Sequence, residues 1–329
     1  MKERQNIEDF EISESEDIEK KALGALSITK KKLQNKKNKL LFVWGWLALP
    51  IISWIVFYWY VNFSAFVQAF QDPLTNAFSW INFQNIWKEI TAGNTYLDSL
   101  SVGFRNTMKY FLLEILAKYP IQLIVCYFLY KQIKGYKFYR FIFYMPAILP
   151  GVAMASVFKE IVAYNGILDT LGFNIPEQGL LGHYTTATNT VMAYSIWLCV
   201  SGHMLLFCGA MNRVPVEVLE AARLDGITPL KELIFLIIPL IWPTLSTLLL
   251  MTCCGFLGSS GNILLLAPDS VSLGTTTISY WIFSKVYANG TQGGQYNLVS
   301  AAGLLLTAVA FPIVLGLRKL LELVPSVEY

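Results

Sequence analysis

Long apolar blocks alternate with short polar segments along most of the chain. Six blocks each hold roughly 20 or more mostly apolar residues, which is the length an α-helix needs to cross ~30 Å of hydrocarbon. The blocks are residues 40–61, 110–130, 138–162, 191–211, 233–258 and 297–317. We therefore predict an all-α polytopic membrane protein with six transmembrane helices.

The second and third blocks are the least uniform, because Glu114, Lys118 and Lys159 lie within them and Lys109 lies directly before the second. Glu114 and Lys118 are four residues apart, so they share a helix face. An ion pair inside a membrane is expensive and is by default a candidate for function. Because each charge neutralises the other, we favour a structural role for this pair.

Composition supports a membrane protein and gives no sign of catalysis. Hydrophobic residues make up 55% of the 329 residues and charged residues 14%, far less polar surface than a soluble chain of this length needs. All five cysteines fall in or next to apolar blocks without metal-ligand spacing, and the chain has two histidines. We predict no metal site, no bound cofactor and no enzymatic activity for this chain.

The distribution of lysine and arginine predicts the orientation. Positive residues concentrate in the tail before the first block, in the second-to-third and fourth-to-fifth connections and at the C-terminal end, whereas the other three connections are nearly bare. Positive residues favour the cytoplasm. Both termini and residues 212–232 are therefore predicted to be cytoplasmic. No signal peptide is apparent, because the first apolar block starts near residue 40 and is too long for one.

We divide the chain into a cytoplasmic tail, 1–39, and a transmembrane domain, 40–323. The tail is acidic and then polybasic, ending in KKKLQNKKNK at 30–39. A lysine run can bind nucleic acid, but directly before a span we expect it to lie against anionic headgroups, at about 1 kcal/mol per lysine. We expect no nucleic-acid partner. Residues 275–287 are amphipathic and aromatic, which predicts a helix at the outer interface.

Prolines occur in pairs four residues apart: Pro146 with Pro150, and Pro239 with Pro243. Each proline removes a backbone hydrogen bond and bends a helix. Kinked helices can line a pathway that opens and closes, or they can be static packing features. The sequence leaves both interpretations open.

The fourth-to-fifth connection, residues 212–239, contains the run EAARLDGITPLKELIFLIIP. Pro215 suits the first turn of a helix, and Gly226 suits the left-handed residue that ends one. Thr228 is then an N-cap, with Pro229 as the first residue of the next helix. We predict two short helices joined by a glycine elbow. The residues alone leave two interpretations open. The segment can offer its carboxylates to a basic partner protein, or it can be an amphipathic helix at the membrane interface with an internal Glu220–Arg223 ion pair.

This run resembles the EAA loop of the permeases of binding-protein-dependent ABC importers. The matching residues are Glu220-Ala221-Ala222, Gly226 and the ending Leu236-x-Ile238-Pro239, where the family usually has Ile-x-Leu-Pro. Further stretches resemble the maltose-type sugar permeases: RNTMKY at 105–110, the proline-rich 139–161, YNGILDTLG at 164–172 with Asp169 where asparagine is usual, and GNILLL at 261–266. The likeness covers roughly residues 40–320.

The resemblance implies the ABC importer permease fold and a set of partners. These are two ATP-binding subunits, a second permease that we expect to be a different but related chain, an extracellular solute-binding protein and a carbohydrate substrate, expected to be an oligosaccharide. ATP and Mg are expected on the ATPase, since this chain has no G-x-x-x-x-G-K-[ST] phosphate loop. The expected location is the bacterial cell membrane. The residues implied in ATPase coupling are Glu220, Ala221, Ala222, Arg223, Asp225, Gly226 and Pro239.

Candidates for the substrate path are Trp197, Ser201, His203 and Asn262. The first three nearly share a helix face, and sugars bind through aromatic faces and polar groups that match hydroxyls. For His203 an interior hydrogen-bonded histidine is the competing interpretation. Amino acid or peptide cargo is an alternative within the same family. A secondary transporter, a membrane enzyme and a scaffold are the other classes considered.

Overall fold

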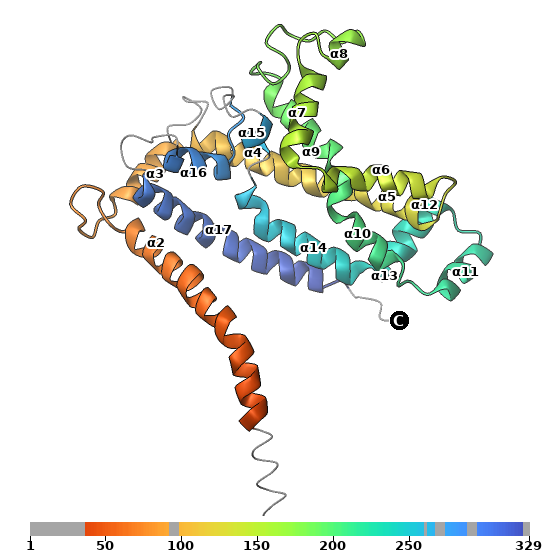
Figure 1. The fold of residues 1–329 in the computed structure, drawn as a ribbon, viewed down its shortest axis with the longest axis horizontal. Coiled ribbons are helices and arrows are strands. Elements are labelled where there is room, and N and C mark those ends of the chain that lie inside the picture. The colour runs from red at the N-terminus through yellow and green to blue at the C-terminus, as the bar shows by residue number, and fades with distance from the viewer. Residues whose placement is uncertain (1–36, 92–98, 260–261, 267–273, 288–294, 325–329) are drawn as a thin grey trace, which may run out of the picture. The chain divides into compact units, whose positions relative to one another are not determined.

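The computed structural model describes residues 37–91, 99–259, 262–266, 274–287 and 295–324. These residues are nearly all helical (Figure 1) and contain no β-strand, only an isolated antiparallel bridge between Gln71 and Phe78. The chain separates into two compact units, residues 1–65 and 66–329. The prediction of an all-α protein is confirmed for the described residues.

The first unit is dominated by one helix. It begins at Lys37, includes the π-helical turn η1 (Ile55–Tyr60) and continues into α2 (Val61–Ala69). Its sequence is apolar around the whole circumference between residues 40 and 61. A helix of this kind is stable only where lipid or other helices surround it.

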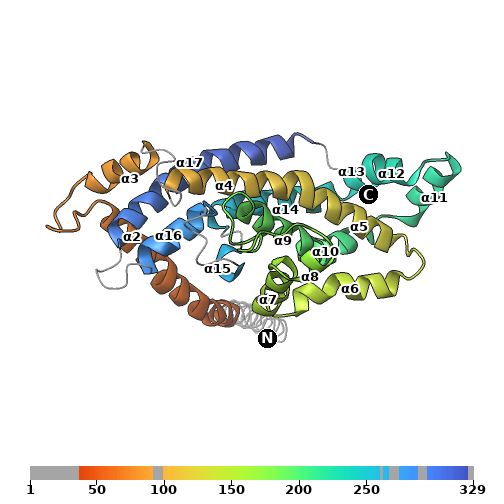
Figure 2. The same cartoon turned by 90° about the horizontal axis from the view of Figure 1, so that it is seen from above.

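The second unit is a bundle built on long helices that lie side by side. α4 (Leu100–Leu113), η3 (Glu114–Lys118) and α5 (Tyr119–Tyr130) follow one another without a break. α10 (Cys199–Met211) packs along α5, and α14 (Trp242–Gly255) packs along α17 (Tyr296–Glu322), as Figure 2 shows. Tyr127, Met204, Phe207 and Ile237 are fully buried where these helices meet.

Five helices in the described residues are long and apolar enough to cross a membrane: Lys37–Ala69, Leu100–Tyr130, Gly151–Thr170, Ala187–Met211 and Tyr296–Glu322. A sixth candidate is the pair Pro229–Leu240 and Trp242–Gly258, bent by 78°. The bend lies between Pro239 and Pro243. Pro243 has no N–H for the carbonyl of Pro239, and its ring displaces that carbonyl, so the helix turns at Ile241.

The third predicted span, 138–162, is not one helix. It is divided into α6 (Tyr136–Ile148) and α7 (Gly151–Val162). Leu149 is extended, with ψ 145°, because the ring of Pro150 disfavours the helical conformation of the residue before it. Pro146 lies inside α6 without ending it. The candidate span here runs from Gly151 to Thr170 and consists of α7 and α8 (Ile167–Thr170), between which Ala163 is extended with ψ 157°.

Three shorter helices lie at the end of the second unit away from the α5–α6 turn (Figure 1). They are α3 (Ile81–Thr91), α15 (Ile263–Leu266) and α16 (Ile278–Tyr287). α16 confirms the helix predicted within 275–287. Its Ile278 and Trp281 are buried against α4 and α17. This helix therefore packs into the bundle at its edge.

Asn106 connects α4 to the segment before α16. Its amide nitrogen donates to the carbonyl oxygens of Gly274 (2.7 Å) and Thr276 (2.9 Å). Thr107 Oγ1 accepts from the backbone N–H of Ile278 at 3.0 Å. Gly103 permits the close approach, because a Cβ there would lie 3.2 Å from the carbonyl carbon of Thr277. The Asn-Thr pair of the RNTMKY stretch is thus a structural clamp.

Replacing Asn106 with leucine is expected to lower the melting temperature of the detergent-purified protein clearly. The change leaves two carbonyls without their donor, and an unsatisfied buried group costs about 1–3 kcal/mol. Asn174→Leu, at an exposed loop position, is the matched control and is expected to leave the melting temperature almost unchanged. Equal shifts for the two variants would contradict the clamp.

Candidate functional site

Residues 215–232 form the predicted pair of short helices. α11 (Val216–Leu224) is followed by Asp225 as its C-cap and by Gly226 with φ +74°. The N–H of Gly226 donates to Arg223 O (3.1 Å), and the N–H of Ile227 donates to Ala222 O (3.2 Å). This is the Schellman arrangement, which requires a left-handed residue and so favours glycine. The glycine elbow is confirmed.

The ends of these helices follow the predicted signals with small differences. Pro215 is the N-cap of α11, one residue earlier than the first turn, and Pro229 is the first residue of α12 (Pro229–Glu232). Thr228 is the N-cap of α12, but its side chain makes no capping hydrogen bond. α12 continues through η4 (Leu233–Ile237) into α13 (Ile238–Leu240), which contains Pro239.

α11 presents one buried face and one exposed face. Leu219 is buried in the bundle core, whereas Glu220, Ala221, Arg223 and Asp225 are exposed and Ala222 is half-buried. In the part of the chain that the structure describes, Glu220 forms no ion pair with Arg223. The exposed carboxylates and small side chains are therefore available to a partner.

Leu224 is a further exposed residue of this helix that the sequence interpretation did not single out. Its side chain is 90% exposed at the last position of α11. In Figures 1 and 2, α11 lies at the same end of the second unit as the α5–α6 turn, which contains Lys131 and Lys134. An apolar side chain with so large an exposed fraction, on a helix that also exposes carboxylates, is a candidate anchor for a protein partner.

An ion pair fixes the start of α12 to the end of α5. Glu232 is 3% exposed and its Oε1 is paired with Lys131 Nζ. The Lys131 ammonium also lies 5.6 Å from the centre of the Tyr127 ring. From the sequence, the lysines of this turn predict only the orientation of the chain. Nothing in the sequence shows that Glu232 faces one of them.

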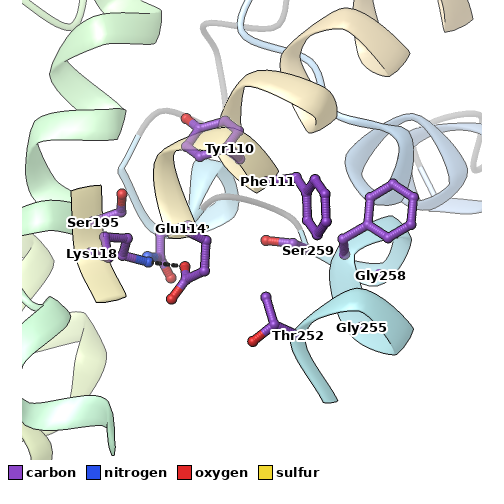
Figure 3. Close-up of a pocket in the computed structure, with 11 residues that line it drawn as sticks. Tyr110, Phe111, Glu114, Lys118, Ser195, Thr252, Gly255, Gly258 and Ser259 are labelled. Atoms are coloured by element: carbon purple, nitrogen blue, oxygen red, sulfur yellow. Dashed lines mark hydrogen bonds and ion pairs between the residues drawn. The ribbon is translucent and has the colours of Figure 1, made fainter. Parts of the chain in front are cut away.

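A cavity of about 460 Å³ lies between η3 and the end of α14. Figure 3 shows the Glu114 carboxylate joined to the Lys118 ammonium at one side, and the hydroxyls of Thr252 and Ser259 across from them. The rings of Phe111 and Phe256 form a tilted pair with centres 4.9 Å apart. The full lining is Tyr110, Phe111, Glu114, Lys118, Ser195, Thr252, Gly255, Phe256, Gly258, Ser259 and Asn262.

A smaller cavity of about 150 Å³ shares Glu114, Lys118, Ser195 and Asn262 with the first and reaches His203. His203 Nδ1 lies 3.2 Å from Gln122 Oε1, and its ring stacks on Tyr119 with centres 5.5 Å apart. His203 is therefore both an interior hydrogen-bonded residue and part of a cavity wall.

The other candidates for the substrate path are divided between the cavities and the packing around them. Asn262 lines both cavities. Trp197 lines neither and stacks on Phe158, with ring centres 5.8 Å apart. Ser201 donates to the carbonyl of Leu198 at 2.9 Å and also lies outside both linings. The face expected to be common to Trp197, Ser201 and His203 is interrupted at Leu198, where α9 (Ala187–Trp197) ends and α10 begins.

Comparison with known proteins identifies the family. Residues 123–323, more than half of the chain, match the family described as "Binding-protein-dependent transport system inner membrane component". The chain belongs to this family. The match includes the α11–α12 elbow and confirms the predicted family.

Individual relatives point to the sugar-type branch of these permeases. The chain is 24% identical to the multiple sugar-binding transport system permease protein MsmF of Streptococcus mutans over 292 residues, which cover 87% of this chain and 96% of MsmF. It is 25% identical to the arabinooligosaccharides transport system permease protein AraP of Bacillus subtilis over 279 residues, covering 82% and 85%.

A solved structure of a bacterial alginate ABC transporter, in complex with an alginate pentasaccharide-bound periplasmic protein, shares the fold. One of its chains superposes with a TM-score of 0.71 at 20% identity, covering 86% of this chain and 95% of that chain. The chain is thus a sugar-type binding-protein-dependent permease and a multi-pass protein of the bacterial inner membrane, with five or six apolar spans among the residues that the structure describes.

Proposed function

We propose that this chain is the membrane subunit of an ATP-driven importer for carbohydrate, with an oligosaccharide as its cargo. The relatives support this cargo, because MsmF and AraP carry sugar names and the alginate transporter is named for a polysaccharide. The chain forms half of the translocation path, beside a second permease that is a different, related chain. An extracellular solute-binding protein delivers the sugar, and two ATP-binding subunits hold ATP and Mg. Catalysis takes place on those subunits.

The observation that carries the proposal is the exposed α11–α12 elbow at the end of the second unit that contains Lys131. In this proposal the loop 212–239 is cytoplasmic and seats in the ATPase. Glu220 and Asp225 offer carboxylates to basic groups, and Ala221 and Ala222 allow close approach. Both termini are cytoplasmic, the bent pair Pro229–Gly258 is counted as the fifth of six spans, and residues 40–323 form the permease domain behind the tail 1–39.

The connection from elbow to cavity runs through one bent helix. α12, η4 and α13 continue from the elbow to the bend at Ile241, and α14 continues from there to Thr252 and Gly255 in the cavity wall. Movement of the elbow, when the ATPases close around nucleotide, therefore moves a wall of the cavity. Gly226 and the bend after Pro239 are the joints of this lever.

The experiment is reconstitution of the full complex in proteoliposomes with the binding protein and radiolabelled oligosaccharides. ATP-dependent accumulation is expected, and it should vanish when the phosphate-loop lysine of the ATPase is replaced. Accumulation that continues without ATP and collapses with a protonophore would identify a secondary transporter instead. Accumulation of peptides or amino acids but no sugar would assign the other cargo class.

A further inference from the structure

The cavity between η3 and α14 contains a charge arrangement that bears on which sugars it accepts. Across both cavity linings, Glu114 and Lys118 are the charged residues. Their side chains are 20% and 16% exposed and are paired with each other. In the residues that the structure describes, the wall of the cavity therefore contains one acidic and one basic side chain and no excess of either charge.

The rest of the wall is neutral and suited to a polyhydroxylated ligand. Ser259 and Asn262 provide a hydroxyl and an amide group. The hydroxyls of Ser195 and Thr252 also face the cavity, although the first donates to Met192 O and the second bonds to the Tyr119 hydroxyl. The Phe111–Phe256 ring pair provides an apolar face on which the C–H side of a sugar ring can lie.

A neutral sugar and an acidic sugar meet this pair differently. A hydroxyl can donate to the carboxylate of Glu114 and accept from the remaining N–H groups of Lys118, and such charge-assisted bonds are strong where water is excluded. An added carboxylate or phosphate places a second anion beside a cation that is already paired. Burying an anion without its own partner is strongly unfavourable.

We propose that the Glu114–Lys118 pair makes this cavity selective for uncharged oligosaccharides over uronate-containing or phosphorylated ones. The proposal rests on the proposed carbohydrate cargo and narrows it. It also gives the intramembrane pair a role in specificity, in place of the purely structural role that the sequence favoured.

The test measures binding to the purified, nucleotide-free complex of permeases and ATPases without the solute-binding protein, so that only the cavity selects. Equilibrium dialysis compares neutral probes (maltotriose, arabinotriose and chitobiose) with acidic probes (digalacturonate and an alginate trisaccharide). The wild-type complex is expected to bind at least one neutral probe about tenfold or more tighter than either acidic probe, a difference of about 1.4 kcal/mol.

Two variants separate charge from folding. Glu114→Gln leaves Lys118 as an unpaired cation and is expected to improve binding of the acidic probes relative to the neutral ones by about tenfold. Glu114→Gln combined with Lys118→Gln removes both charges and is expected to exclude the acidic probes again. Lys109→Gln, on the same helix but outside both linings, is the control and should keep the wild-type ratio.

Equal or tighter binding of the acidic probes by the wild-type complex would overturn the selectivity and leave carbohydrate cargo intact. An unchanged ratio in Glu114→Gln would also overturn it. A wild-type complex that binds no probe of either kind would refute the carbohydrate cargo itself, and the selectivity with it.

Discussion

Leu224→Asp is expected to abolish ATP-dependent uptake while leaving the protein folded and inserted. The wild-type side chain is 90% exposed, so its replacement removes almost no contact within the chain. In the assembled complex we expect it to be buried against the ATPase, and burying a leucine contributes about 1.5–3 kcal/mol. Loss of about 2 kcal/mol weakens association roughly 30-fold. Titrated co-purification of the ATPase subunit measures this directly.

The matched control for Leu224 is Leu74→Asp. Leu74 is 92% exposed and lies in the connection between α2 and α3, outside the elbow. Both variants place the same charge at an equally exposed leucine. ATPase association should fall for Leu224→Asp and stay at the wild-type level for Leu74→Asp. Retention of the ATPase by both variants would remove Leu224 from the interface.

The second large effect is expected at the pair between Lys131 and Glu232. Breaking a buried ion pair by removing one partner costs about 3–5 kcal/mol, because the other charge stays buried without compensation. Lys131→Met leaves the buried Glu232 carboxylate unpaired and should lower the apparent free energy of unfolding in detergent strongly. Glu232→Leu leaves Lys131, whose side chain is 22% exposed, and should lower it less. The double variant should recover most of the loss, since neither charge remains.

The exposed pair Arg318–Glu322 is the control for this comparison. Its side chains are 63% and 60% exposed, and exposed pairs contribute little because water screens them. Arg318→Met should therefore leave stability nearly unchanged. If the Lys131 and Glu232 single variants behave like Arg318→Met, or if the double variant is as unstable as the sum of the two, the pair does not hold α12 to α5.

The elbow could be predicted from the sequence because its signals are local. Pro215 and Pro229 fix the backbone at helix starts, and Gly226 permits the left-handed conformation that ends a helix, so a run of a few residues determines where α11 ends and α12 begins. Pro239, the last residue of the run 220–239, was identified from the same pattern. No long-range contact was needed.

The third span shows where apolar length fails as a guide. Residues 138–162 read as one continuous block, since a run of apolar residues does not reveal a break in the backbone. The structure ends α6 before Pro150. A bend was predicted at that proline, whereas the extended Leu149 separates two helices and the candidate span runs from Gly151 to Thr170.

The cavity was mostly beyond prediction because its residues come from distant parts of the chain. Phe111 and Phe256 carry no motif, and only packing of α4 against η5 (Phe256–Gly258), the turn that follows α14, brings them together. Glu114 and Lys118 were visible as an unusual pair, but their position in a cavity wall was not. Trp197 and Ser201 were chosen by helical spacing, which the break at Leu198 interrupts.

In the proposed complex, the elbow is the contact with a separate ATPase. The most direct measurement is cross-linking in membranes from Ala221→Cys or Asp225→Cys, after replacement of the exposed Cys254 by serine. We expect a covalent product between this chain and an ATP-binding subunit, and we expect the yield of that product to change when nucleotide is added. Absence of that product from both positions, in a chain that still transports sugar, would contradict it.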